Sequence, residues 1–218
     1  KRSGTREPRL PIEGELPAER ETSVTVGSVL TAIALVVFGY LVGSLSPSVW
    51  LGKAFKDLDP RQHGSGNAGT TNAFRVLGVR LGVAVLVADI LKGVVPVLIT
   101  HFISSPTVTV LVAFACVLGH NYSIFLRGRG GKGVATGAGA AIGMMPIPMA
   151  ILVTLFVILS FSTRIVSIAS ITCTILLPVL AFLFQQPLPY IIGCCAMSLV
   201  VLWAHRKNMV RLWRRQES

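Results

Sequence analysis

Seven apolar runs follow a polar beginning of the chain. They cover residues 27–46, 81–103, 107–126, 134–145, 147–162, 165–184 and 188–204. A helix needs about 20 predominantly apolar residues to cross the hydrocarbon core of a bilayer. The pattern therefore predicts an all-α, polytopic membrane protein with seven transmembrane helices.

The fourth and fifth runs are shorter than the others. Residues 144–148 separate them with two prolines, which cannot continue one straight helix. The fourth run also contains Gly137, Gly139 and Gly143, and small residues let helix backbones approach closely. We therefore expect this run to pack inside the bundle rather than to face lipid.

Basic residues occur in alternate segments between the runs. The basic segments, with fourteen Lys and Arg residues, are 53–80, 127–132, 164 and 206–215, and the loops near 104–106, 144–148 and 185–189 contain none. Short loops rich in Lys and Arg stay in the cytoplasm. The distribution predicts an N-terminus outside and a cytoplasmic C-terminus.

Composition strengthens the membrane prediction. The chain is 52% hydrophobic and only 13% charged, whereas soluble domains carry about 25% charged residues. Residues 1–22 hold five basic and five acidic side chains, and we expect them to form a mobile polar tail that is not a signal peptide. Residues 23–218 form the expected single seven-helix domain.

The whole net charge of +11 belongs to this membrane domain. Such an excess suits nucleic acid, anionic lipid or an anionic substrate, or only reflects the topology. The four cysteines lie in apolar runs without metal-ligand spacing, so we expect buried hydrophobic side chains and neither a disulfide framework nor a metal site. These residues are Cys116, Cys173, Cys194 and Cys195.

A first polar cluster covers residues 61–75. Its glycines, Gly64, Gly66 and Gly69, can turn successive backbone N–H groups toward an anion, and Arg75 adds a forked cation suited to phosphate. The side chains that add hydrogen-bonding groups are Ser65, Asn67, Thr70, Thr71 and Asn72. The alternative is a flexible linker, although such a density of polar side chains favours binding.

A second cluster combines residues 119–121 with residues 127–136. Its glycines expose amides, and Lys132 adds a positive charge. The spacing does not match the Walker A phosphate loop. The G-x-G-x-x-G patterns of both clusters do not follow a strand, so they do not indicate dinucleotide binding.

Two further clusters lie at helix ends on the same predicted side of the membrane. Ser167 and Ser170 share one helix face, although serines often bond to their own helix. His205, Asn208 and Arg211 share another face near the C-terminus. Four clusters on one side predict a site for anionic head groups at the membrane surface.

Asp89 and Lys92 are the exception, because they lie within an apolar run. Their i,i+3 spacing places both on one helix face, where pairing reduces the cost of burial. A structural and a catalytic role both remain open.

At these motifs the chain resembles the bacterial acyl-phosphate:glycerol-3-phosphate acyltransferases, a family of integral membrane proteins, over residues 27–217. The matching motifs are Gly64-Ser65-Gly66-Asn67-x-Gly69-x-Thr71-Asn72-x-x-Arg75, Asp89-x-x-Lys92-Gly93, Gly119-His120, Gly130-Gly131-Lys132-Gly133-Val134-Ala135-Thr136, Val166-Ser167-x-Ala169-Ser170 and His205-Arg206-x-Asn208-x-x-Arg211-Leu212. Several separated motifs in one order are improbable by chance.

The resemblance implies a set of site residues on the cytoplasmic side of a bacterial inner membrane. Those implied to be catalytic are Ser65, Arg75, Lys132, Ser170, His205 and Asn208. Those implied to bind the phosphates are Gly64, Gly66, Asn67, Gly69, Thr71, Asn72, His120, Gly130, Gly131, Gly133 and Thr136. Neither a metal nor another cofactor is implied, and the partners are membrane lipids and the two substrates rather than nucleic acid.

The implied reaction moves an acyl chain from acyl phosphate to glycerol-3-phosphate and yields lysophosphatidic acid. The H-x-x-x-x-D dyad of other acyltransferases is absent after all four histidines. The proton acceptor is either His205 or the donor's own phosphate, and we favour the phosphate. Transfer through an acylated Ser65 is the less favoured route.

Other classes of protein remain as alternatives. A transporter for a phosphorylated metabolite is the main one, but such sites usually lie at the bilayer midplane between repeats. A lipid phosphatase would need a nucleophile or metal ligands, and a purely structural membrane protein would not need the polar clusters.

Overall fold

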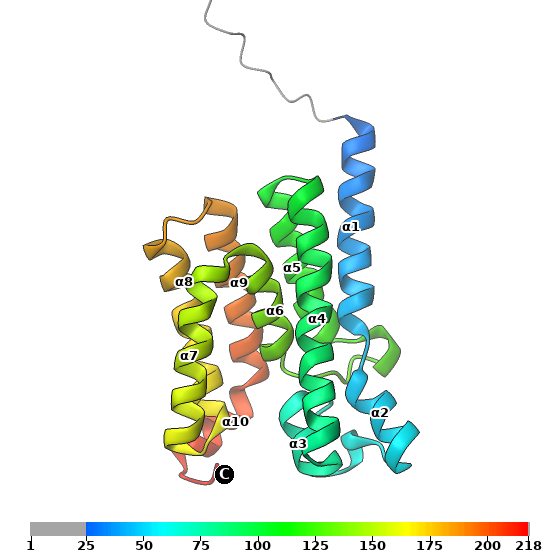
Figure 1. Cartoon of the computed structure of the whole chain (residues 1–218), viewed down its shortest axis with the longest axis vertical. Helices are drawn as coiled ribbons and strands as arrows, with labels where there is room; N and C mark the ends of the chain where they lie inside the picture. The colour runs from blue at the N-terminus through cyan, green and yellow to red at the C-terminus, as the bar shows by residue number, and fades with distance from the viewer. Residues whose placement is uncertain (1–24, 218) are drawn as a thin grey trace, which may run out of the picture.

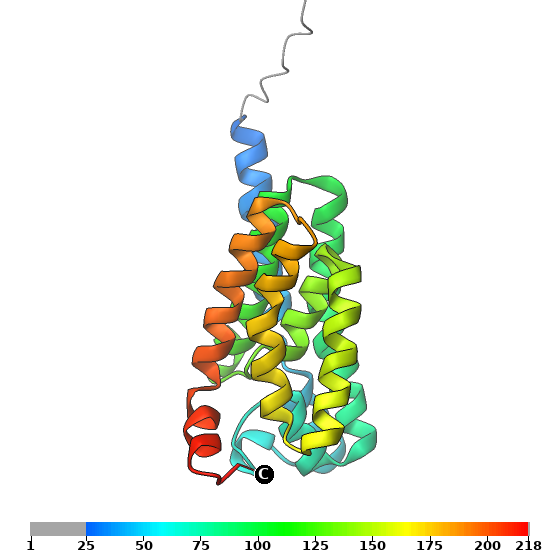
Figure 2. The same cartoon turned by 90° about the vertical axis from the view of Figure 1, so that its left-hand side faces the viewer.

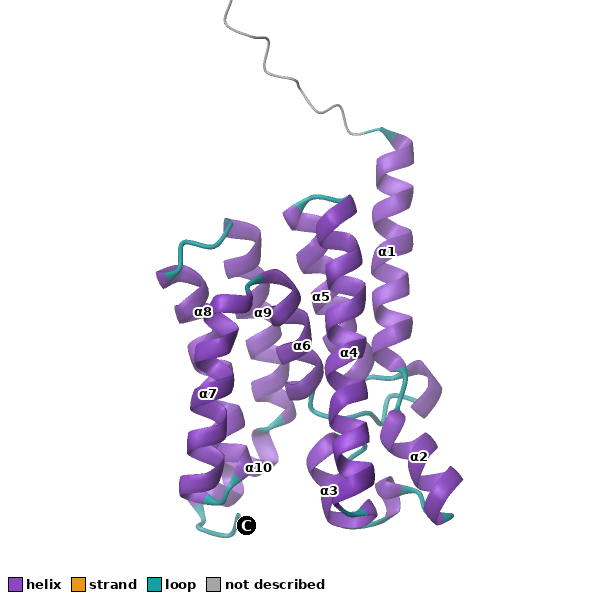
Figure 3. Ribbon diagram, in the orientation of Figure 1, coloured by secondary structure: helices purple, strands orange, loops and turns teal. Residues whose placement is uncertain are grey.

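The computed structural model describes residues 25–217, so the predicted tail at residues 1–22 lies outside the described residues. Every element in the described range is helical (Figure 3). The elements are α1 (Val26–Ser44), α2 (Pro47–Lys56), η1 (Pro60–Gln62), α3 (Thr70–Leu77), α4 (Val79–Ile103), α5 (Pro106–Asn121), η2 (Ile124–Leu126), α6 (Val134–Met144), α7 (Pro146–Thr163), α8 (Val166–Leu183), α9 (Leu188–Ala204) and α10 (Arg206–Trp213).

Each of the seven apolar runs forms one helix, from α1 and then α4 through α9. Five helical segments in the described range are long and apolar enough to cross a membrane, and a sixth is added if α9 and α10 count as one span bent by 60°. Helix α6 is apolar but has only 11 residues. The all-helical membrane architecture expected from the apolar pattern is confirmed.

The long helices lie side by side in a bundle (Figures 1 and 2). The short helices α2, α3 and α10 gather at one end of it, where the described chain also ends. Among the five long segments, the one containing α5 is the most buried, and its residues Val112, Cys116 and Val117 are fully enclosed. Helix α5 is therefore the centre of the core.

Close contact between α4 and α6 depends on glycine. A Cβ atom on Gly139 would lie 2.1 Å from the carbonyl oxygen of Ile90, and one on Gly93 would lie 2.2 Å from that of Thr136. At Gly143 the nearest atom, in Val97, would be 2.8 Å away. The predicted close packing of the fourth run is confirmed at these positions.

The break between α6 and α7 lies where the prolines predict it. Helix α6 ends at Met144, and α7 begins at Pro146, where a missing N–H costs nothing. The prediction for the cysteines is only partly confirmed, because Cys116 and Cys194 are buried but Cys195 is exposed.

Helix α3 was not expected from the apolar pattern. Ala73 and Leu77 are buried on one face of this eight-residue helix, whereas Thr71 and Arg75 are exposed on the other. The amphipathic period is correct for a helix, but two turns are too short to distinguish it from a polar loop. Residues 70–75 of the first predicted cluster therefore belong to helix α3, which begins at Thr70, and not to a loop.

Candidate active site

One cavity of about 720 Å³ connects the polar end of the bundle with its apolar interior. Its walls come from α3 through α10, together with the loops before α3 and α6 and the C-terminal segment. All six side chains that the sequence marks as catalytic line it. These are Ser65, Arg75, Lys132, Ser170, His205 and Asn208.

The residues marked as phosphate-binding divide into two groups. Those that line the cavity are Asn67, Gly69, Thr71, Asn72, His120 and Gly133. Those that do not are Gly64, Gly66, Gly130, Gly131 and Thr136. The second group lies behind the first and acts on the shape of the loops.

Asn72 organises the first loop. Its Nδ2 donates to the carbonyl oxygens of Pro60 at 2.7 Å, His63 at 3.1 Å and Asn67 at 2.9 Å. Its Oδ1 accepts from the backbone N–H of Ser65 at 2.8 Å. One buried side chain therefore holds the loop that presents Ser65 to the cavity.

The predicted nest of glycine amides is wrong at several positions. The amide of Gly66 donates to the carbonyl oxygen of His63, and that of Gly69 donates to Oδ1 of Asn67. Because these amides and that of Ser65 already have protein acceptors, they are not directed at a ligand. At this loop, side chains rather than these amides are available to an anion.

The second loop fits tightly against the end of α5. The amides of Gly130 and Gly131 donate to the carbonyl oxygens of Asn121 and His120, at 3.2 and 2.9 Å. A Cβ atom on Gly131 would lie only 1.9 Å from Nε2 of His120. These glycines therefore let the loop pack closely against α5, and their amides are not available to an anion. This packing places Lys132 at the cavity.

Asp89 and Lys92 form a buried ion pair of 2.9 Å that does not line the cavity. Asp89 accepts a hydrogen bond of 2.9 Å from the hydroxyl of Thr70, and its carboxylate lies 3.6 Å from Nδ1 of His120. Lys92 donates to the carbonyl oxygen of Leu45 at 2.6 Å. The pair connects α4 with the start of α3 and the end of α5, which favours the structural role.

A hydrogen-bonded chain fixes Asn208 at the polar end. Lys132 donates to Oδ1 of Asn208 at 2.5 Å, and Nδ2 of Asn208 donates to Glu217. The other carboxylate oxygen of Glu217 pairs with Arg211. Arg211, which the sequence places in the C-terminal polar cluster, and Glu217 also line the cavity. Glu217 was not among the predicted site residues, and its signal in the sequence is that it is a single acid within a basic terminal segment.

The two ends of the cavity differ in charge and polarity. Among the described residues that line it, the cations are Arg75, Lys132, Arg164 and Arg211, and Glu217 is the only acid. Along its length the wall is apolar, with Leu86, Ile90, Leu152, Phe156 and Leu177. Met149 and Arg164 are fifteen residues apart along α7, which corresponds to about 20 Å of helix. The cavity can therefore hold an anionic head and a long apolar chain together.

The model of the glycerol-3-phosphate acyltransferase family matches residues 33–215. The chain belongs to this family. A relative of that name from Fusobacterium nucleatum subsp. nucleatum is 38% identical over 178 residues, or 81% of this chain and 92% of the relative. Another, from Shouchella clausii, is 41% identical over 192 residues, or 84% of this chain and 93% of the relative.

Solved structures agree with the family membership. The chain matches the crystal structure of PlsY, an integral membrane glycerol 3-phosphate acyltransferase, in its glycerol 3-phosphate form with a TM-score of 0.84. The identity is 35%, over 86% of this chain and 94% of that chain. The lysophosphatidic acid form of PlsY gives a TM-score of 0.81 at 33% identity, over the same shares of the two chains. The predicted assignment to a family of membrane acyltransferases is confirmed.

Burial lowers the pKa of Lys132 to about 8, and the charges of Arg211 and Arg75 act in the same direction against that of Glu217. Burial raises the pKa of Glu217, but the hydrogen bonds from Arg211 and Asn208 outweigh it and hold the pKa below its usual value. In this arrangement Glu217 stays charged at neutral pH, whereas Lys132 loses its charge as the pH rises above about 8.

His205 lies just beyond the last residue of α9. Its Nδ1 donates to the carbonyl oxygen of Val201 at 2.8 Å, which leaves the lone pair of Nε2 as an acceptor in the neutral ring. Burial, with the charge of Lys132 acting in the same direction, lowers the pKa of His205 to about 4, although the hydrogen bond to Val201 and the charge of Glu217 oppose the shift. A group with so low a pKa accepts a hydrogen bond well but takes up a proton poorly.

Proposed function

We propose that this chain transfers an acyl chain from acyl phosphate to glycerol-3-phosphate, giving lysophosphatidic acid and inorganic phosphate. The observation that supports it is the single cavity that joins four cations to an apolar wall. The donor needs both, because its phosphate is an anion and its chain is apolar. Glycerol-3-phosphate needs only the polar end.

We assign the phosphates of the two substrates to Arg75, Lys132 and the neighbouring cations of the cavity. Guanidinium and ammonium groups make charge-assisted hydrogen bonds with phosphate, which are about twice as strong as neutral ones. The hydroxyl of Ser65 and the amide of Asn208 complete the polar lining. The hydroxyl of Ser170 donates to the carbonyl oxygen of Val166, so it would rotate to donate to a substrate.

The chemical step in this proposal is direct transfer. The glycerol hydroxyl oxygen attacks the carbonyl carbon of the acyl phosphate and forms the new C–O ester bond. The anhydride C–O bond breaks, phosphate leaves with the electron pair, and the hydroxyl proton moves to a phosphate oxygen. Because a mixed anhydride is already activated, positioning and charge stabilisation supply most of the catalysis.

The position of His205 supports a proton transfer to the donor's phosphate. Its Nε2 can accept the hydrogen bond of the attacking hydroxyl and so orient it. Its pKa of about 4 makes it a weak base, whereas the phosphate oxygen of the donor gains basicity as the anhydride bond breaks. His205 is therefore assigned an orienting role.

We further propose the full topology that the sequence predicts: seven spans, the N-terminus outside, and the site on the cytoplasmic side of a bacterial inner membrane. Five helical segments are long and apolar enough to span, α9 has 17 residues, which is within the range for a span, and α6 supplies the short seventh. The basic segments near α2, α3 and α10 lie at the same end of the bundle (Figure 1). The positive-inside rule assigns that end to the cytoplasm.

The test uses purified protein in detergent, with phosphate release measured after addition of acyl phosphate and glycerol-3-phosphate. We expect phosphate release that requires both substrates. When acyl-CoA replaces acyl phosphate, the leaving group would be CoA, so the control measures lysophosphatidic acid directly, and we expect none to form. Arg75→Gln removes a cavity cation and should lower kcat/KM by at least about tenfold, because a hydrogen bond to a charged group contributes about 1.5–3 kcal/mol. Arg80→Gln, at an exposed position outside the cavity, is the matched control.

Two outcomes would contradict the proposal. Phosphate release that does not depend on glycerol-3-phosphate would indicate a phosphatase. Uptake of glycerol-3-phosphate into vesicles without acylation would indicate the transporter.

A further inference from the structure

A second cavity of about 400 Å³ lies apart from the candidate active site and shares no lining residue with it. It is lined by Arg61, Phe125, Leu126, Arg127 and Arg129. Three of these five side chains are guanidinium cations. Nothing in the acyl transfer described above uses this cavity.

The cavity is built by two segments that pack together. Val49 of α2, Ala68 and Leu126 of η2 form one buried apolar cluster. The hydroxyl of Ser123, just before η2, donates to the carbonyl oxygen of Ser44 at 2.6 Å. Helix α2 and η2 are thus joined directly, beside the end of α1.

A tight turn presents two of the three arginines. Arg127 has a positive φ of 51°, and Gly128 follows with a φ of 76°. The amide of Gly128 donates to the carbonyl oxygen of Ser123, and the amide of Arg129 donates to the carbonyl oxygen of Leu126. The backbone that supports both arginines is therefore fixed.

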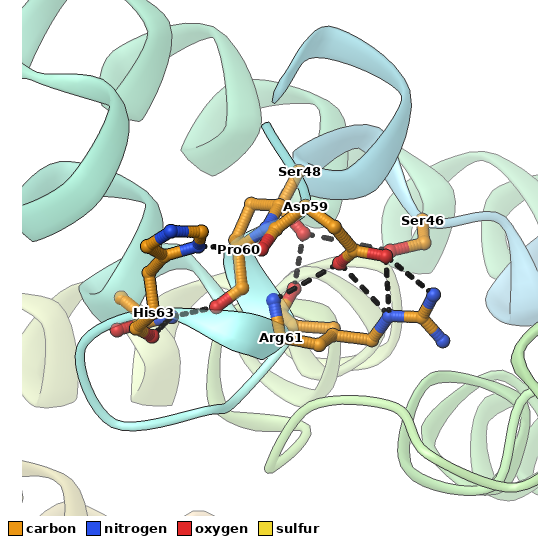
Figure 4. A network of polar contacts seen from close by, with 8 residues as sticks. Ser46, Ser48, Asp59, Pro60, Arg61 and His63 are labelled. Carbon is orange, nitrogen blue, oxygen red and sulfur yellow. Dashed lines mark hydrogen bonds and ion pairs between the residues drawn. The ribbon is translucent and has the colours of Figure 1, made fainter. Parts of the chain in front are cut away.

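The third arginine is already paired. Arg61 donates from Nε and Nη2 to the carboxylate of Asp59, at 3.0 and 2.6 Å (Figure 4). Within residues 25–217, no carboxylate lies within ion-pair distance of Arg127 or Arg129. Lys53 and Lys56 add two exposed cations on α2. The local balance of charge is strongly positive.

Exposed apolar side chains occur on α2 and η2, the two segments that are joined beside this cavity. The exposed fractions are 52% for Trp50, 68% for Phe55, 59% for Ile124 and 56% for Phe125. Aromatic side chains mixed with Lys and Arg at the end of membrane helices are typical of the depth of the lipid head groups. A surface open only to water would not favour so much exposed apolar area.

We propose that this cavity binds the phosphate of an anionic phospholipid head group. Arg127 and Arg129 would donate to the phosphate oxygens, since guanidinium groups form paired hydrogen bonds with phosphate. Trp50 and Phe125 would contact the glycerol and the start of the acyl chains. The apolar rim selects a membrane lipid over a free phosphate ion, which has no apolar part to bury.

Trp50 can report the occupancy of this site. The variant Trp203→Phe/Trp213→Phe leaves Trp50 as the only tryptophan of the three in the chain. This variant is placed in phosphatidylcholine nanodiscs that contain either brominated phosphatidylglycerol or, at the same mole fraction, brominated phosphatidylcholine. We expect the anionic lipid to quench the fluorescence of Trp50 more strongly.

Arg127→Gln/Arg129→Gln in this background should reduce the preference for the anionic lipid at least about tenfold, since each arginine would lose a charge-assisted hydrogen bond with the phosphate. Arg80→Gln/Arg214→Gln is the control. It removes the same charge at two exposed positions outside both cavities and should retain the preference. Thermal unfolding in phosphatidylcholine alone confirms that each variant is folded.

Three results would overturn the proposal. Equal quenching by the two lipids would show that the cavity does not select anionic lipid. Equal loss in both double variants would show a general effect of positive charge. Loss of the preference on addition of millimolar inorganic phosphate would identify a site for a soluble anion.

Discussion

At the scale of single residues, the shape of the loops of the candidate active site depends on residues that hydrogen-bond to the backbone or let it approach closely. Asn72 uses both ends of its amide within the first loop, and Gly131 lets the second loop approach His120. Sequence motifs identify these positions but not their function. The same residue types would bind an anion directly or shape a loop, and only the hydrogen-bond partners distinguish the two.

Lys132 leads to a prediction about pH at this scale. Its pKa of about 8 means that it is charged below that pH and neutral above it. In the proposed reaction kcat/KM should therefore fall above pH 8, by up to about tenfold per pH unit. Lys132→Arg keeps the charge, because arginine stays protonated, and should move the fall to higher pH.

The measurement is kcat/KM as a function of pH, which reports groups of the free enzyme. Binding of phosphate to Lys132→Arg at neutral pH, followed by calorimetry, controls for a damaged site. An unchanged alkaline fall in this variant would assign it to another group.

At the scale of elements, the seven apolar helices were predictable, because burial in lipid requires a long apolar run wherever a helix crosses. The break at residues 144–148 was also predictable, because proline removes a helical hydrogen bond. Helices α3 and α10 were not. Each has eight residues, and tertiary contacts rather than a long sequence pattern stabilise helices of that length.

The contact between α4 and α6 gives a prediction for stability. Gly139→Ala would place a Cβ atom 2.1 Å from the backbone carbonyl oxygen of Ile90, so the two helices must separate. We expect a loss of about 1–3 kcal/mol, as for other overpacked interiors. It would be measured as a lower midpoint of thermal unfolding in detergent.

Gly137→Ala is the matched control on the same helix. Its nearest new neighbour would be a side-chain atom of Val117 at 3.6 Å, which is ordinary contact. This variant should keep its midpoint or raise it, because alanine favours helix over glycine by up to about 1 kcal/mol. Equal midpoints for both variants would contradict the proposed role of the α4–α6 contact.

At the scale of the whole molecule, the cavity brings together segments that are far apart in the chain. Ser65 and Glu217 line the same wall, although almost the full described chain lies between them. Predicting that four polar clusters lie at one membrane surface needed only the positions of charges. Their meeting in one cavity needed the packing of α3 through α10.

The apolar length of the cavity predicts the selection of acyl chains. Leu177 lines the cavity on α8, and Leu177→Phe adds volume there. In the proposed reaction we expect kcat/KM for palmitoyl phosphate to fall about tenfold relative to that for decanoyl phosphate, which is within the range for a changed apolar pocket. Rates of phosphate release with each donor measure this ratio.

Leu183→Phe is the control for this variant, because residue 183 is 63% exposed and lies outside the cavity. It should leave the ratio of the two donors unchanged. An equal decrease for both donors in Leu177→Phe would mean that the acyl chain does not reach this part of the cavity.

The sequence alone determined that this protein is a helical membrane protein with polar clusters at one end. Those properties follow from local physical chemistry, because a bilayer favours long apolar helices and short basic loops wherever they occur along a chain. The tertiary structure decided which glycine amides are already bonded, and that Arg211 and Glu217 join the candidate active site. These features depend on distances between segments remote in sequence, and such distances are set only when the helices pack.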